Sequence, residues 1–296
     1  MSPASLEDVL PDPRAARRAF DRAAETFDAA SVVHDEARDR LVGRLELMRL
    51  SPAVIVDLGS GLGAGARQLR ARFPDARLLA VDWSLPMLAA GRARGTPAAP
   101  IAGAAERLPL KNGQVDLIFA NMLLPWSRPE RLFREAARTL TQGGLLLFST
   151  LGPDTLEQLR RAWAAVDDRV HVHAFVDMHD LGDLAVASGL AEPVVDVDRM
   201  ELRYRDVHSV IRDLRSCGAV NVAAGRRRAL TGRARWAGFE RALESGRHAG
   251  RFPVTVELIL GHAWGSGRAP LARRGRAPGE VGVAPEDIGI MRRRPR

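Results

Sequence analysis

The clearest hydrophobic pattern in the chain is a short apolar run at residues 54–58 that ends at an acid and a group of glycines. Asp57 lies inside this run, and glycines follow at alternate positions, Gly59, Gly61 and Gly63. A continuous apolar run of this length predicts a strand buried on both faces, and the glycines predict a tight turn whose N–H groups can approach a ligand. Residues 64–73 have apolar positions at helical spacing, so a helix N-terminus is expected to face that ligand. Strand, glycine turn and helix together predict the opening of a nucleotide-binding α/β sheet.

The same alternation of apolar runs and helical periods continues along the chain. Further strands are expected at 78–82, 98–102, 115–121, 145–150, 193–204 and 255–262, and helices at 14–28, 31–50, 85–94, 128–140, 154–166, 177–188 and 207–217. Strands that alternate with helices predict a mostly parallel sheet with right-handed crossovers. The fold class expected is therefore a doubly wound α/β protein with a mostly parallel, seven-stranded sheet, which binds ligands at the carboxyl ends of its strands.

Composition narrows the function classes. The formal charge is +8, but residues 266–296 hold eight arginines against three acids, so +5 of that charge lies in a Gly/Pro/Arg-rich tail that is expected to be disordered. Lys111 is the one lysine among 44 basic residues, a bias that reflects coding composition more than phosphate binding. We therefore expect no specific nucleic-acid partner. Cys217 is the single cysteine, which leaves no intrachain disulfide or thiolate metal cluster.

The apolar runs are too short for a membrane span, and residues 1–13 have no apolar signal-peptide core. The expectation is a cytoplasmic enzyme, with no membrane partner, that acts as a monomer.

Two acids beside the glycine turn indicate the kind of nucleotide. The turn satisfies the loose dinucleotide pattern, which alone is ambiguous. Asp57 precedes the first glycine, where a carboxylate would repel a pyrophosphate but accept hydrogen bonds from a cationic or amine-bearing ligand. Asp82 closes the next predicted strand and is suited to accept both ribose hydroxyls. This pair of acids resembles the S-adenosylmethionine site of class I methyltransferases.

Longer stretches carry a more specific resemblance. They are FDRAA at 20–24, FSTLGPDTL at 148–156, DMHD at 177–180, RDLRSCGAVN at 212–221, LTGR at 230–233 and GHAWG at 261–265. Together they resemble the malonyl-acyl carrier protein O-methyltransferases of biotin synthesis over roughly residues 14–265. The resemblance implies an N-terminal helical lid at 1–50, a methyltransferase domain at 51–265 with an acceptor-side helical insertion at about 205–250, and the tail at 266–296. For the segment 20–24, simple packing on the sheet edge is the alternative to a lid.

The activity implied is transfer of a methyl group from S-adenosylmethionine to the free carboxylate of malonyl on an acyl carrier protein. A malonyl carboxylate is already ionised at neutral pH, so no residue is expected to act as a general base. Orientation and exclusion of water would carry the reaction instead. No metal cofactor is expected.

The resemblance also assigns cofactor residues. Asp57, Gly59, Ser60 and Gly61 would hold the methionine part, Asp82 the ribose and Trp83 the adenine, with Ala105 and Glu106 in the loop after the third strand and Asn121 near the sulfonium. One departure is Ala104, where relatives often have an acid that accepts from the adenine amine. Either Glu106 or a backbone carbonyl substitutes for that acid, or the cofactor binds more weakly.

On the acceptor side the interpretations stay open. Arg212 and Arg215 share a helix face and would hold the acceptor carboxylate, unless they are ordinary surface arginines. Asn121 and Trp126 would line the acceptor pocket, although Trp126 also suits a core. A basic cluster, Arg226, Arg227, Arg228 and Arg233, would contact the acidic carrier protein or else form a solvated loop. The spacing of His171, His173 and His179 matches no metal-binding pattern.

Several other functions remain open on sequence alone. The acceptor is either malonyl-carrier protein or malonyl-CoA, or another small acid or thioester. A related protein-arginine-modifying assembly factor and a non-catalytic cofactor-binding adapter are the remaining alternatives.

Overall fold

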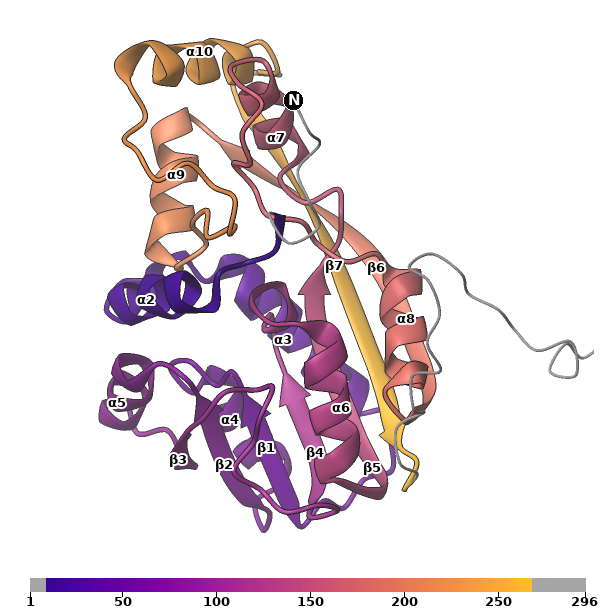
Figure 1. The fold of residues 1–296 in the computed structure, drawn as a ribbon. Helices are drawn as coiled ribbons and strands as arrows, with labels where there is room; N and C mark the ends of the chain where they lie inside the picture. The colour runs from indigo at the N-terminus through magenta and orange to yellow at the C-terminus, as the bar shows by residue number, and fades with distance from the viewer. Residues whose placement is uncertain (1–8, 268–296) are drawn as a thin grey trace, which may run out of the picture.

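The computed structural model describes residues 9–267, which form a seven-stranded sheet flanked by helices (Figure 1). The strands are β1 (Val54–Leu58), β2 (Arg77–Asp82), β3 (Ala99–Ala102), β4 (Val115–Ala120), β5 (Leu140–Leu151), β6 (Leu190–Tyr204) and β7 (Phe252–Gly265). Their order across the sheet is β3-β2-β1-β4-β5-β7-β6, with β1 to β5 parallel and β7 antiparallel to both of its neighbours. The predicted fold class, a doubly wound and mostly parallel sheet, is confirmed.

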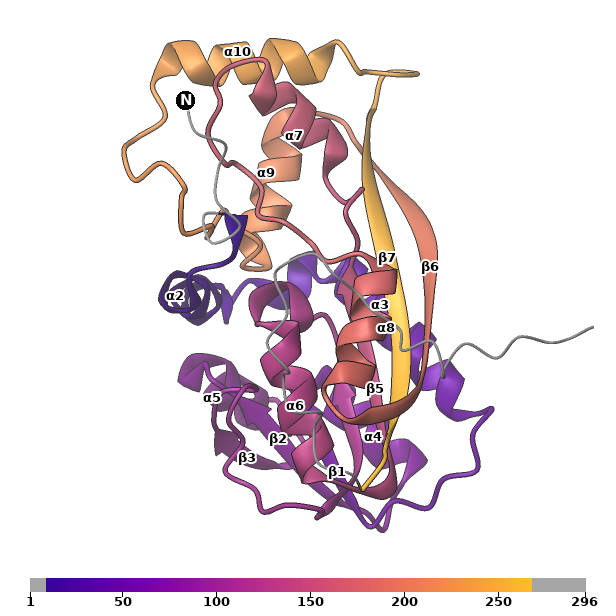
Figure 2. The same cartoon turned by 45° about the vertical axis from the view of Figure 1, so that its right-hand side comes forward.

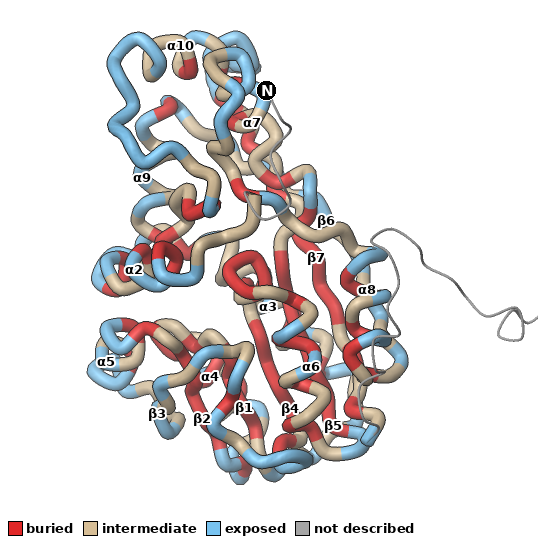
Figure 3. Tube along the Cα trace, viewed as in Figure 1, coloured by how far each residue is buried: buried red, intermediate tan, exposed pale blue. Residues whose placement is uncertain are grey.

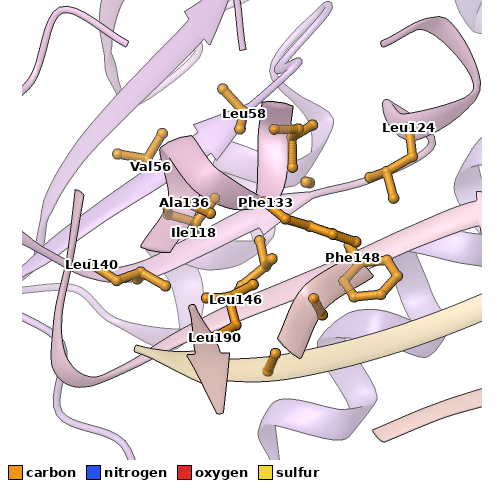
Figure 4. Packing of buried hydrophobic residues seen from close by; sticks show 14 of the residues in the cluster. Val56, Leu58, Ile118, Leu124, Phe133, Ala136, Leu140, Leu146, Phe148 and Leu190 are labelled. Carbon is orange, nitrogen blue, oxygen red and sulfur yellow. The ribbon is translucent and has the colours of Figure 1, made fainter. Parts of the chain in front are cut away.

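Helices cover both faces of the sheet because its strands are apolar on both faces. The helical elements are α2 (Pro13–Ala23), η1 (Phe27–Ala30), α3 (Val32–Leu45), α4 (Ala64–Arg72), α5 (Leu85–Ala93), η2 (Leu124–Trp126), α6 (Pro129–Thr139), α7 (Glu157–Ala164), α8 (Met178–Ala187), α9 (Val207–Ser216) and α10 (Arg233–Glu244). On one face Phe133 of α6 and Leu181 of α8 share a buried cluster with strand residues such as Val56 and Phe148. Figure 4 shows Phe133 next to Phe148 in this cluster. On the other, α3 and α4 pack against strand residues of opposite parity such as Ile55.

The strands β6 and β7 extend well past the rest of the sheet. Residues 258–264 of β7 pair with β5, while residues 252–257 continue beyond the last of these pairs and still pair with β6. The helices α7, α9 and α10 pack on this two-stranded extension around Phe239 and Phe252. Figures 1 and 2 show these helices above the carboxyl edge of the parallel strands. Residues 205–250, together with α7, therefore form a separate layer over that edge.

Some element bounds differ from the sequence expectations. The helix expected at 14–28 ends at Ala23 and is followed by η1, and the helix expected at 31–50 ends at Leu45. The strand β5 is longer than expected because it begins at Leu140, which pairs with Val115, and includes Gly143 and Gly144 before its main pairing resumes at Leu145. The strands β6 and β7 are longer because their pairing with each other runs from Leu190 and Gly265 to Tyr204 and Phe252. The tail expected at 266–296 lies outside the described residues except for its first two. Across residues 9–267 no helix is long and apolar enough to cross a membrane.

Candidate active site

The glycine turn after β1 is held in a conformation that favours glycine at three positions. Gly59, Gly61 and Gly63 all have positive φ, at 71°, 51° and 78°. A Cβ on Gly63 would lie 2.0 Å from Oγ1 of Thr96, whereas a Cβ on Gly61 would meet no protein atom within 4 Å. Gly63 is therefore required by packing, while Gly61 leaves open space beside the turn. We call residues 57–63 together with Asp82 the cradle.

Two buried oxygens in the cradle have no hydrogen-bond partner. Asp57 is 3% exposed and its Oδ2 is unpaired, and the buried Oγ of Ser60 is unpaired as well. Burial raises the pKa of Asp57 to about 7, opposed by the N–H of Ala66 and reinforced by the charge of Asp82. Unpaired buried acceptors call for a donor, so these residues fit the cationic amino-acid part of S-adenosylmethionine.

Asp82 connects the end of β2 to the glycine turn. Its Oδ2 accepts from the N–H of Gly61 at 2.9 Å and its Oδ1 accepts from the N–H of Ser84 at 2.8 Å. Burial raises the pKa of this carboxyl, and the three backbone N–H groups around it work in the opposite direction. Each carboxylate oxygen retains acceptor capacity, which suits ribose hydroxyls. Next to it, Trp83 packs in one cluster with Phe20 and Trp126.

Asn121 at the end of β4 uses its side-chain amide to hold the backbone. Its Nδ2 donates to the carbonyl of His34 on α3 at 3.0 Å, and its Oδ1 accepts from Oγ of Ser149 at 2.7 Å. Met122, which follows, has a positive φ of 54°. Asn121 thus ties α3 to the carboxyl edge of β4 and β5, next to the cradle.

The acid in the loop after β3, Glu106, is held by residues at the start of α6. The Oε1 of Glu106 accepts from the N–H of Arg128 at the start of α6 at 2.8 Å, and its other oxygen lies 3.7 Å from the guanidinium of Arg131. Ala104 is exposed and Ala105 packs partly against the core. Both carboxylate oxygens of Glu106 are therefore engaged with residues at the start of α6.

A cavity of about 320 Å³ lies between the carboxyl edge of β4 and β5 and the overlying helices. Its wall is mostly apolar and includes Val33, Met122, Trp126, Leu151, Leu159 and Val256. Residues of η1, α3, α7, α9 and α10 and of the extended part of β6 and β7 complete the wall. Asp213 and Arg215 line it as well, and Arg215 is the one arginine or lysine in its wall among the described residues.

The structure brings some of the predicted acceptor residues to this cavity and leaves others outside. Trp126 is both buried and part of the wall, so it serves the core and the cavity together. Arg215 reaches the rim with an exposed side chain. Arg212, one helical turn earlier, does not line the cavity and donates to Oγ of Ser209 at 2.9 Å on the outer face.

The wall also contains polar residues that the sequence analysis did not assign to the pocket, among them His34, His173, Tyr204 and Asp213. Burial, followed by the charge and hydrogen bond of Asp213, raises the pKa of Tyr204 to about 12. His173 is buried and its Nε2 is unpaired. These residues come from segments far apart in the chain, and no spacing rule links them.

The histidines considered for metal binding have separate partners. His171 pairs with Asp167 at 2.8 Å and stacks on Trp163, while the exposed His179 pairs with Asp177. No group of three or more His, Cys, Asp or Glu within residues 9–267 is arranged to hold a metal ion.

Comparison with known proteins places these features in a class. Residues 56–148 match the family model described as "Methyltransferase domain". The solved structure of the YcgJ protein from Bacillus subtilis, 16% identical, superposes with a TM-score of 0.55 over 76% of this chain and 98% of that one, which shows a shared fold. Fold and cradle together define a class I S-adenosylmethionine-dependent methyltransferase.

Two curated relatives are much closer in sequence. A malonyl-[acyl-carrier protein] O-methyltransferase from Laribacter hongkongensis is 43% identical over 87% of this chain and 91% of its own length. One from Halorhodospira halophila is 38% identical over 99% of this chain and all of its own. The chain belongs to the malonyl-[acyl-carrier protein] O-methyltransferase family.

Proposed function

We propose that this chain transfers the methyl group of S-adenosylmethionine to the free carboxylate of a malonyl group on an acyl carrier protein. The product is the malonyl methyl ester that starts pimeloyl and biotin synthesis. The observation that carries the proposal is a cradle with two buried acids beside an apolar cavity, in a chain with near full-length relatives of that name.

The apolar wall of the cavity suits this chemistry for an electrostatic reason. S-adenosylmethionine supplies an electrophilic methyl group on a positively charged sulfur. The malonyl carboxylate is ionised at neutral pH, so no proton has to be removed. Transfer consumes one positive and one negative charge, and a dry site of low dielectric favours such a step because it replaces the hydration of both charges. The chain contributes orientation and exclusion of water.

The same argument assigns the two arginines to binding and not to the transfer step. A guanidinium bound to the carboxylate would hold its lone pairs and weaken it as a nucleophile. Arg215 is exposed at the rim and Arg212 lies on the outer face. Both are therefore proposed to attract the negatively charged acceptor to the mouth of the cavity.

An exposed segment beside the mouth is proposed as the carrier-protein contact. Residues 227–235 comprise the segment before α10 and the first residues of that helix, and we call them the basic loop. All of them are exposed (Figure 3), and Leu230 is 93% exposed. Thr231 in the same loop lines the cavity. Arg227, Arg228 and Arg233 surround an apolar residue, which suits an acidic partner surface with an apolar centre. Arg226 is instead half-buried, where it donates to the carbonyl of Ala223.

Reversing charge on the basic loop is expected to weaken binding of the carrier protein without changing the rate of the methyl transfer step. In the double variant Arg227→Glu/Arg228→Glu, KM for malonyl-carrier protein should rise about tenfold, since charge pairs steer association. Its dependence on ionic strength should shrink, while kcat with a small malonyl thioester stays unchanged. The matched control is Arg77→Glu at the exposed start of β2. Equal KM changes in the two variants would refute the assignment.

The first turns of the chain are proposed to act as a lid that joins the two halves of the site. Ser84 donates from its Oγ to Oδ1 of Asp21 on α2 at 2.6 Å, next to Asp82 of the cradle. Phe20 meets Trp126 edge-on with ring centroids 5.1 Å apart. We further propose that the protein acts as a metal-independent monomer in the cytoplasm, for which light scattering and chelator-treated assays are the checks.

The central test is a methyl-transfer assay with labelled S-adenosylmethionine and malonyl-carrier protein. The expected product is a base-labile methyl ester on the carrier. Acetyl-carrier protein, which lacks the free carboxylate, is the matched control and should stay unlabelled. A parallel reaction with malonyl-CoA decides which acceptor is preferred. Absence of label on malonyl-carrier protein, in protein that binds S-adenosylhomocysteine, would overturn the proposal.

A further inference from the structure

A second hollow lies against α9, next to the cavity. It measures about 310 Å³ and is lined by His208, Ile211, Arg212 and Arg215 of α9 and by Trp236 of α10. We call it the outer pocket. Ile211, Arg215 and Trp236 line the cavity as well, so these three side chains form a common border between the outer pocket and the cavity.

The outer pocket is cationic. His208, Arg212 and Arg215 follow one another at spacings of four and three residues, so they lie on one face of α9. All three are exposed. The part of the chain that the structure describes contributes no carboxylate to the lining, and Glu240 lies beside it, with its Oε1 3.8 Å from Nε2 of His208. A cluster of this kind favours an anionic ligand.

The two arginines of the outer pocket are not neutralised by acids. Within residues 9–267, the side chain of Arg215 has no hydrogen-bond or ion-pair partner, and Arg212 donates only to Oγ of Ser209, at 2.9 Å. The carboxylate of Asp206 acts on Arg212 only through space, because it accepts from the N–H and the Oγ of Ser209. Both guanidinium groups therefore keep N–H donors for a ligand.

The acceptor of the proposed reaction carries two negative groups, at opposite ends of its arm. The malonyl carboxylate is at one end and has to reach the sulfonium methyl group. The arm of an acyl carrier protein is joined to the carrier through a phosphodiester, which is at the other end. A guanidinium matches a phosphate through two parallel hydrogen bonds. Binding the phosphodiester in this way leaves the carboxylate free to act as the nucleophile.

The position of the outer pocket suits the position of the phosphodiester along the arm. Trp236 follows the basic loop directly in the chain, and Thr231 of that loop lines the cavity. The outer pocket is therefore next to both the proposed carrier contact and the cavity. The phosphodiester likewise lies between the carrier protein and the thioester.

We propose that Arg212 and Arg215 bind the phosphodiester of the arm that carries the malonyl group. The proposal states which charge of the acceptor the two arginines hold, and it gives Arg212, which does not line the cavity, a partner in the outer pocket. This inference rests on the proposed function, because it assumes a malonyl thioester on such an arm.

The experiment compares two small acceptors, malonyl-pantetheine and malonyl-phosphopantetheine, which differ only in the phosphate group. The wild-type protein should prefer the phosphorylated acceptor by about tenfold in kcat/KM, chiefly through KM, as expected for a charge-assisted contact at an exposed site. In the double variant Arg212→Gln/Arg215→Gln that preference should vanish. On malonyl-carrier protein, which presents the phosphate as a diester, KM of the same variant should rise about tenfold.

The control removes the same charge elsewhere. Arg72→Gln/Arg77→Gln changes two exposed arginines at the end of α4 and the start of β2 and should keep the wild-type preference. Both double variants should bind S-adenosylhomocysteine with wild-type affinity, which shows that they are folded.

Three results would overturn the inference: equal wild-type kcat/KM for the two acceptors, an undiminished preference in Arg212→Gln/Arg215→Gln, or an equal loss of preference in the control. Failure of every malonyl substrate, carrier-bound included, in protein that binds S-adenosylhomocysteine would instead overturn the proposed function, and this inference with it.

Discussion

Replacing Asp57 by asparagine is expected to weaken binding of S-adenosylhomocysteine by about 100-fold at about pH 8, because a buried carboxylate facing a cationic amino group is lost. The unpaired Oδ2 of Asp57 and the unpaired Oγ of Ser60 are the acceptors that such a ligand would satisfy. Isothermal calorimetry measures the change. The control is Asp196→Asn on the edge strand β6, which pairs with Arg44 and should bind normally.

The same carboxyl makes cofactor affinity depend on pH. The pKa of Asp57 is raised to about 7 without ligand, and the ligand cation favours the ionised form. Below about pH 7 binding must first release a proton, so wild-type affinity should fall with decreasing pH, by up to about tenfold per unit. Asp57→Asn should lack this dependence. Calorimetry in buffers of different ionisation enthalpy counts the proton, and a flat wild-type profile would contradict the role.

Stability should change in the opposite direction to affinity. A pKa raised in the folded state means that the folded protein holds this proton more tightly than the unfolded chain does. The ligand-free protein therefore loses stability through this group as pH rises from about 4 to about 7. Asp57→Asn should unfold at the wild-type temperature or above it at about pH 8. A variant that binds poorly yet unfolds late cannot be explained by misfolding.

Gly63→Ala is expected to have the largest effect on stability. Its Cβ would lie 2.0 Å from Thr96 Oγ1 at a φ of 78°, so clash and backbone strain add to a loss of about 2–4 kcal/mol in unfolding free energy. Gly61→Ala is the matched control, since its Cβ meets no protein atom within 4 Å. It should lose only about 1 kcal/mol.

Ligand affinity is expected to fall in Gly61→Ala, the variant that loses less stability. The Cβ of Gly61→Ala would stand in the open space of the cradle and exclude S-adenosylhomocysteine, although the fold is nearly intact. Urea unfolding measures the unfolding free energy of each variant, and calorimetry measures the affinity of each for S-adenosylhomocysteine. If Gly61→Ala were as unstable as Gly63→Ala, or bound the ligand normally, the cradle would be wrongly placed.

The parts of the fold and site that could be predicted from sequence are those with local signals. The strand at 54–58 and the acids Asp57 and Asp82 follow from an apolar run, a glycine spacing and a strand end, all within thirty residues. Helical spacing likewise places Arg212 and Arg215 on adjacent turns. It does not say which side of the helix meets the cavity, where Arg215 is part of the wall and Arg212 is not.

The residues that could not be predicted depend on long-range packing. His34 reaches the cavity because Asn121 binds its carbonyl 87 positions away, and His173 does so because Trp126 and Phe175 enclose its ring. Tyr204 ends the strand expected at 193–204, but the sequence does not indicate that β6 extends past the parallel strands there. Such contacts depend on the whole fold and produce no pattern among residues that are close in the sequence.

The height of the cavity depends on how far β6 and β7 extend beyond the parallel strands. Both strands continue from the sheet into the layer of α7, α9 and α10, so these two strands hold the helices that cover the cavity. Two residues added to both strands would preserve the alternation of inward and outward side chains and would move these helices about 7 Å further from the parallel strands. Members of such a family can therefore come to admit longer acceptors through paired insertions alone, with the nucleoside side untouched.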